Sequence, residues 1–165
     1  MLFRSGSTTN GVVSVASGTF SNAAGNFNAD GADANNTVTM TVNTVRPTIA
    51  VTSGAAALKA GETATITFTL SEAATDFALA DAVATGGTLG TFTAVSGTVY
   101  TAVFTPTAGS TTNGVVSVAS GTFSDAAGNF NTDGADANNT VTMTVNTVPP
   151  TIAVTSSAAA LKAGE

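Results

Sequence analysis

Side chains that could bind a cation gather in one segment of the chain. Residues 121–137 read GTFSDAAGNFNTDGADA and carry Asp125, Asn129, Asn131, Asp133 and Asp136. Calcium prefers hard oxygen ligands from carboxylates, amides and backbone carbonyls, so this segment could hold one. Asp, Asn and Gly are also typical of solvated turns, which leaves a plain loop as the alternative interpretation.

The local motif is not that of an EF-hand. Asn129-x-Asn131-x-Asp133-Gly134 matches the first half of an EF-hand loop. The twelfth position, however, is Thr140, where that loop requires a bidentate glutamate. No flanking helices are predicted either, so any calcium site here would have to be assembled from several loops.

Composition excludes several classes of function. The 165 residues contain 10 acidic and 4 basic side chains, with a net charge of −6 and no histidine or cysteine. Without a basic cluster, nucleic-acid binding is not expected. Without His or Cys, the chain lacks the commonest catalytic groups, so neither an enzyme nor a small-molecule substrate is expected. No apolar run is long enough to insert into a membrane.

The segment belongs to a long internal repeat. Residues 7–62 match residues 110–165 at a fixed offset of 103, with four differences. These differences are Asn22/Asp125, Ala29/Thr132, Arg46/Pro149 and Gly54/Ser157. A period of 103 residues is the size of a domain and far above that of short solenoid repeats.

The repeat phase predicts the domain boundaries. The linkers NTVRPT (43–48) and NTVPPT (146–151) contain prolines that interrupt strands. One complete unit should therefore cover 46–148. Residues 1–45 would be the end of a preceding unit, and 149–165 the start of a following one. Residues 1–6 diverge from their counterparts, which suggests a truncation edge or an appended sequence.

Alternation of apolar and polar residues predicts an all-β fold. It indicates seven strands, near 48–53, 63–71, 78–85, 89–95, 98–105, 114–120 and 139–147. Residues 55–59 should form at most a turn, and no helix is expected. Seven short strands in about 100 residues favour an Ig-like antiparallel β-sandwich, here in tandem.

The topology of such a sandwich adds further residues to the candidate site. Strand 63–71 should return to the end where the linker enters, and so should strand 114–120. The loops that follow these strands would then meet at the linker, while Glu62 would lie at the opposite end. The resulting candidate metal ligands are Glu72, Asp76, Asp81, Asp125, Asn129, Asp133 and Asp136.

Three segments resemble the bacterial Ig-like repeats of giant surface adhesins and biofilm-associated proteins. They are TIAVTSGAAALKAGETATITFTLSEAATDFALAD (48–81), YTAVFTPTAG (100–109) and GTFSDAAGN (121–129). By position, Glu72 matches the family's Ser-Glu, Asp81 its F-x-L-x-D segment, and Asp125 and Asn129 its D-x-A-G-N loop. The sequence departs from the family at Asn43 and Asn146, where related linkers carry aspartate, and this weakens the linker's share in a calcium site.

The resemblance implies tandem extender domains on the bacterial cell surface, exported by a dedicated secretion system, with Ca²⁺ near the domain junctions. The expected function is therefore a spacer whose partners are neighbouring Ig-like repeats of the same chain. One alternative is a module that binds a glycan or a protein, with Phe130 as the most exposed aromatic. Another is an ice-binding surface built from threonines such as those in 140–144, although twisted sheets present poor flat lattices.

Overall fold

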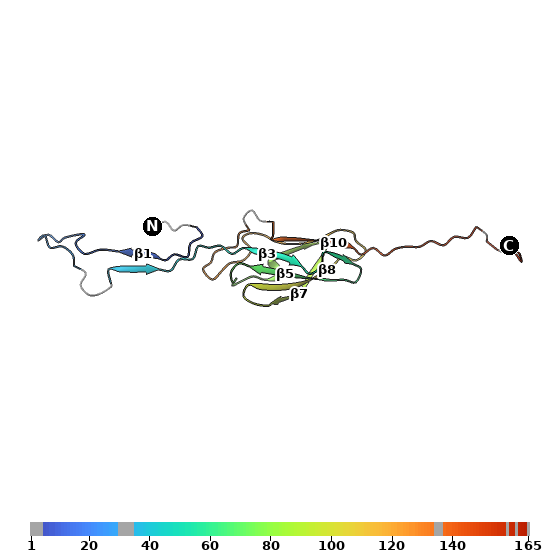
Figure 1. Cartoon of the computed structure of the whole chain (residues 1–165), viewed down its shortest axis with the longest axis horizontal. Coiled ribbons are helices and arrows are strands. Elements are labelled where there is room, and N and C mark those ends of the chain that lie inside the picture. The colour runs from blue at the N-terminus through green and yellow to red at the C-terminus, as the bar shows by residue number, and fades with distance from the viewer. Residues whose placement is uncertain (1–4, 30–34, 134–136, 158, 161, 165) are drawn as a thin grey trace.

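A computed structural model describes residues 5–29, 35–133, 137–157, 159–160 and 162–164. Figure 1 shows three parts in a row: a hairpin near the N-terminus, a β-sandwich in the middle and an extended C-terminal segment. The chain enters the sandwich at one end and leaves it at the other.

The sandwich consists of two four-stranded sheets. The first has the order β3-β5-β8-β7, with strands Ile49–Ser53, Ala64–Leu70, Val99–Pro106 and Gly87–Ala94, all antiparallel. The second has the order β4-β10-β9-β6, with strands Ala57–Lys59, Thr140–Asn146, Gly114–Val118 and Ala82–Thr85. The prediction of an all-β, Ig-like sandwich is confirmed.

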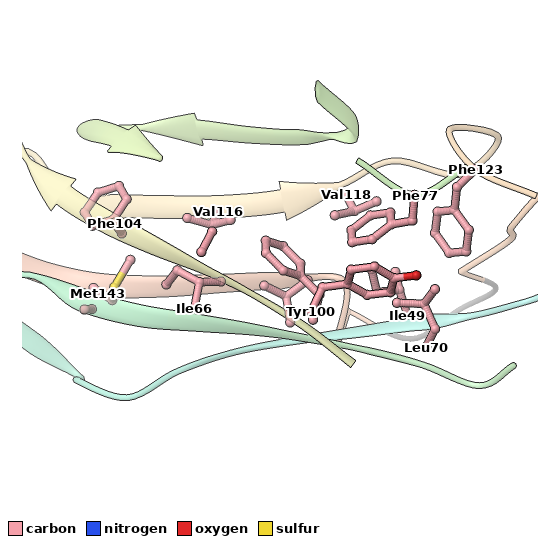
Figure 2. Close-up of a cluster of buried hydrophobic side chains, with 14 of the residues drawn as sticks. Ile49, Ile66, Leu70, Phe77, Tyr100, Phe104, Val116, Val118, Phe123 and Met143 are labelled. Carbon is pink, nitrogen blue, oxygen red and sulfur yellow. The ribbon is translucent and has the colours of Figure 1, made fainter. Parts of the chain in front are cut away.

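Period-two alternation builds the core between the sheets. In β5, Ala64, Ile66, Phe68 and Leu70 are buried while the threonines between them face outward. Residues from β8, β9 and β10 meet them from the other strands, as Figure 2 shows for Phe104, Val116 and Met143. Burial of each large apolar side chain contributes about 1.5–3 kcal/mol, and this supports a fold without disulfides.

An aromatic cluster fills the end of the core where the linker enters. Phe77 lies at its centre, with ring centroids 5.5 Å from Phe68, 5.0 Å from Tyr100 and 5.1 Å from Phe123, all edge to face. Phe77 belongs to the loop after β5, and Phe123 to the loop after β9. Because such edge-to-face pairs are favourable, the cluster fixes both loops to the core.

Two predictions about individual elements were wrong. Residues 55–59 were expected to form at most a turn, but Ala57–Lys59 form β4, which pairs in parallel with β10 and buries Leu58. Residues 78–81 were expected in a strand, but Leu79–Asp81 form a 3-10 turn and β6 begins at Ala82. The first run is too short for its periodicity to identify the element, and pairing with the distant β10 decides it. The 3-10 turn is local and is held by hydrogen bonds between Ala78 and Asp81.

Ahead of the sandwich, the described residues form two strands. β1 (Gly11–Ser14) and β2 (Thr37–Met40) pair antiparallel, and most of their residues are exposed. Phe20 is 62% exposed, whereas its counterpart Phe123 in the complete unit is fully buried. Among the residues described, no helix is long and apolar enough to cross a bilayer.

Candidate functional site at the linker pole

The loop after β5 and the loop after β9 meet where the linker enters the sandwich, as the topology predicted. Ser124 donates from its backbone N–H to Asp76 Oδ1 (2.7 Å) and from its hydroxyl to Asp76 Oδ2 (3.0 Å). Thr75 N–H donates to Ser124 O at 3.0 Å, and Ala74 forms a β-bridge with Asp125. We call this end, formed by residues 71–81, 119–133 and 137–139 with the linker 43–48, the linker pole.

Asp125 is the hydrogen-bonding centre of the linker pole. Its side chain is only 4% exposed. Oδ1 accepts the backbone N–H groups of Ala127 (2.9 Å) and Asn129 (2.8 Å). Oδ2 accepts the side-chain amides of Asn129 (2.9 Å) and Asn43 (3.3 Å). Each carboxylate oxygen of Asp125 has two lone pairs, and each of these lone pairs accepts a hydrogen bond.

These donors set the ionisation of the Asp125 carboxyl. Burial alone would raise its pKa, because a buried charge loses hydration. The hydrogen bonds from the Asn129 side chain and from the backbone of Asn129, Ala127 and Gly128 outweigh burial and lower the pKa below its ordinary value. Asp125 is therefore charged at neutral pH.

The linker is held by the same residues. Asn43 donates its side-chain amide to Asp125, and its backbone carbonyl accepts the Asn129 side-chain amide at 3.1 Å. Asn43 Oδ1 accepts Val45 N–H at 3.0 Å, which fixes the orientation of the amide. We call Asn43, Asp125 and Asn129 the linker clamp. The sequence identified Asn43 only as a departure from the aspartate of related linkers, and its role as an amide donor to Asp125 was not predicted.

Asn131 supports the loop from inside by hydrogen bonds to its backbone. It is 1% exposed. Its Oδ1 accepts the N–H groups of Thr122 (2.8 Å) and Phe123 (3.1 Å), and its Nδ2 donates to Ala119 O (2.9 Å). Its counterpart Asn28 makes the same three bonds although no sandwich surrounds it. The loop is therefore specified by its own sequence.

The remaining candidates do not form one group. Asp81 accepts Ala78 N–H at 2.8 Å and caps its own 3-10 turn. Glu72 is half-buried, and its Oε1 is shielded from solvent without a hydrogen-bond partner. Asp133 is buried in the loop, where its backbone N–H donates to Ser120 Oγ at 3.1 Å. Asp136 lies outside the described residues.

Among the residues described, the candidates are not grouped as the ligands of one calcium ion. Within the described part of the chain, no three Asp, Glu, His or Cys side chains gather in a metal-binding arrangement. The oxygens of Asp76 and Asp125 already accept N–H and O–H donors. At the opposite end of the sandwich, Glu62 instead pairs with Lys59 at 3.4 Å. What the linker pole does in this structure is hold the linker by hydrogen bonds.

Comparison with known protein families gives one match. Residues 43–143, more than half of the chain, match the family model of the bacterial Ig-like domain. The match includes Asn43, Asp125 and Asn129. No curated protein and no solved structure is detectably similar to the chain.

Proposed function

Because the chain belongs to the family of bacterial Ig-like domains, we propose that it is a spacer in a large adhesin on the bacterial cell surface. Ig-like domains of this family are a non-catalytic class of fold and occur in surface proteins. The spacer would hold a terminal binding module away from the cell. Its partners would be the neighbouring repeats of the same chain.

One observation carries this proposal: the linker is bound on both sides. Toward the preceding unit, Thr44 N–H donates to Ser7 O, and Ser7 N–H donates to Thr44 Oγ1, both at 2.9 Å. Toward the complete unit, the adjacent residue Asn43 is held by Asp125 and Asn129. A linker tied to both neighbours transmits direction from one unit to the next, which is what a spacer needs and a flexible tether lacks.

The contacts at the far end of the sandwich also support a spacer. Thr147, the counterpart of Thr44, donates to Ser110 O at 2.9 Å and accepts Ser110 N–H at 2.8 Å. Entry and exit linkers lie at opposite ends of the sandwich (Figure 1). Successive units would therefore add length along one line.

Calcium stiffening remains a prediction from the sequence. The solvent-shielded Glu72 Oε1 supports it, because a carboxylate oxygen that lacks a donor is an available ligand. The hydrogen bonds that join Asp125 and Asn129 to Asn43 favour a junction that holds without an ion. A junction stiffened by calcium and a junction that is stiff without it can be distinguished by measuring one sample with calcium and with chelator.

X-ray scattering on arrays of two, four and six repeats tests the spacer. We expect the maximum dimension to rise linearly, by about 35–40 Å per unit given a rise near 3.3 Å per strand residue. Each array is measured with calcium and with chelator. A greater length with calcium would support the ion, and equal lengths would assign stiffness to the protein alone. A dimension that grows only as the square root of repeat number would contradict the spacer.

Exposed Phe130 favours a second candidate. Its side chain is 53% exposed in the loop after β9, and exposed aromatics suit glycan or protein recognition. A glycan array probed with the chain, with Phe130→Ser as control, tests this module. Binding that is lost in Phe130→Ser would support it.

A further inference from the structure

The two copies of the loop after β9 show which part of the clamp depends on charge. In the preceding unit the residue at this position is Asn22. Its Oδ1 accepts the N–H groups of Ala24 and Asn26, both at 3.0 Å. Asp125 Oδ1 makes the equivalent bonds to Ala127 and Asn129. Either residue can therefore build the turn, because the turn uses one oxygen only.

Aspartate and asparagine at this position differ in the second polar atom of the side chain, which is an oxygen in aspartate and an amide nitrogen in asparagine. Asp125 Oδ2 accepts two amide groups, from Asn129 and from Asn43. An asparagine with the same Oδ1 contacts would place its own Nδ2 there, and a donor would face two donors. Asn43 cannot rotate its amide to compensate without giving up the bond between its Oδ1 and Val45 N–H.

We propose that the residue at position 125 determines how firmly a repeat holds the linker of the repeat before it, and that this hold needs no metal. Aspartate closes the linker clamp with a charge-assisted acceptor. Asparagine, as in Asn22, keeps the loop but leaves only the bond from the Asn129 position to the linker carbonyl. Arrays that mix both residues then contain firm and loose junctions. This inference rests on the proposed function, because its partner is the adjacent repeat.

The depressed pKa of Asp125 agrees with this role. It shows that the surrounding N–H groups favour the charged form over the neutral one. The same donors would favour aspartate over asparagine at this position.

The test is ¹⁵N relaxation on the whole chain in EDTA. We compare native protein, Asp125→Asn, and Asp76→Asn as the control, because Asp76 is a carboxylate of the same pole that binds Ser124 and not the linker. In Asp125→Asn we expect lower heteronuclear NOE values at residues 43–46. We also expect the Asn43 side-chain amide to exchange with solvent about tenfold faster. Asp76→Asn should leave both values at residues 43–46 native.

A second variant tests whether a change in Asp125→Asn comes from the lost acceptor and not from a general loss of structure. The double variant Asn43→Asp, Asp125→Asn places the acceptor on the linker and the donor on the loop. It should raise NOE values at residues 44–46 part of the way to native, because the amide at position 125 gains an acceptor on the linker but still faces Asn129 Nδ2. Core amides of all three variants should keep native shifts. Native linker mobility in Asp125→Asn would overturn the clamp, as would a linker in native protein that orders only when calcium is added. The spacer itself is judged by array length, so either idea can fail alone.

Discussion

At the scale of single residues, the linker pole is organised by amides as much as by acids. Asn131 supports the loop from within, and Asn129 and Asn43 surround the Asp125 carboxylate. A buried carboxylate is costly unless its oxygens are satisfied. Here the amides supply the donors, so the acid can stay charged without a cation.

The pKa of Asp125 leads to a pH prediction. Its folded-state value is lowered, so its stabilisation is complete above the unfolded value of about 3.9 and is lost as pH falls through the folded value. In chelator, native protein should therefore be more stable than Asp125→Asn at pH 7, with the difference shrinking below about pH 4. Thermal unfolding of both proteins across pH measures this.

The linker pole contains other acids besides Asp125. Glu72 and Asp76 belong to the facing loop after β5, and both are present in both proteins. Comparison with Asp125→Asn therefore subtracts their contribution. A stability difference that stays constant from pH 7 to pH 2 would contradict the role of the Asp125 charge.

At the scale of elements, glycines let the two sheets approach each other. Gly114 begins β9 and faces the ring of Phe104. A Cβ at this position would lie 2.6 Å from Phe104 Cε1 and Cζ and 3.3 Å from Met143 Cε. Both neighbours are fully buried, so neither can move without disturbing the core.

Gly114→Ala should therefore lower the free energy of unfolding by about 1–3 kcal/mol, as overpacking does. The matched control is Gly90→Ala in β7, where an added Cβ meets nothing within 4 Å. Gly90→Ala should be neutral or slightly stabilising, because alanine restricts the unfolded chain. Urea denaturation of both variants checks the contrast, and equal losses would contradict the packing argument.

At the scale of the whole molecule, the segments differ in how much apolar surface they bury. The sandwich buries one continuous core, whereas β1 and β2 form a two-stranded hairpin with little to pack against. In the C-terminal segment, Ile152 and Val154 are 89% and 88% exposed. An isolated hairpin is marginal in water, so the ends should open far more often than the sandwich.

Limited proteolysis of the chain should therefore leave residues close to 46–148. A protease that cuts at apolar residues, such as thermolysin, suits this test because the chain has only 4 lysines and arginines. Mass spectrometry of the surviving fragment gives its ends. Early cleavage within 63–105 would contradict the predicted domain boundaries.

The sequence by itself determined the features that depend on local pattern. The 103-residue period can be read directly from the sequence. The alternation of apolar and polar residues located β3, β5, β8, β9 and β10 to within about two residues. The loop around Asn131 is also local, since Asn28 reproduces its hydrogen bonds outside any sandwich.

Only the tertiary structure decided which distant groups meet. β4 exists because β10 offers it a partner. Asn43 reaches Asp125 across 82 residues of sequence. Charge and composition identified an acidic pole, but a carboxylate is satisfied equally by a cation or by N–H groups. The choice between them depends on atomic distances, which no sequence pattern contains.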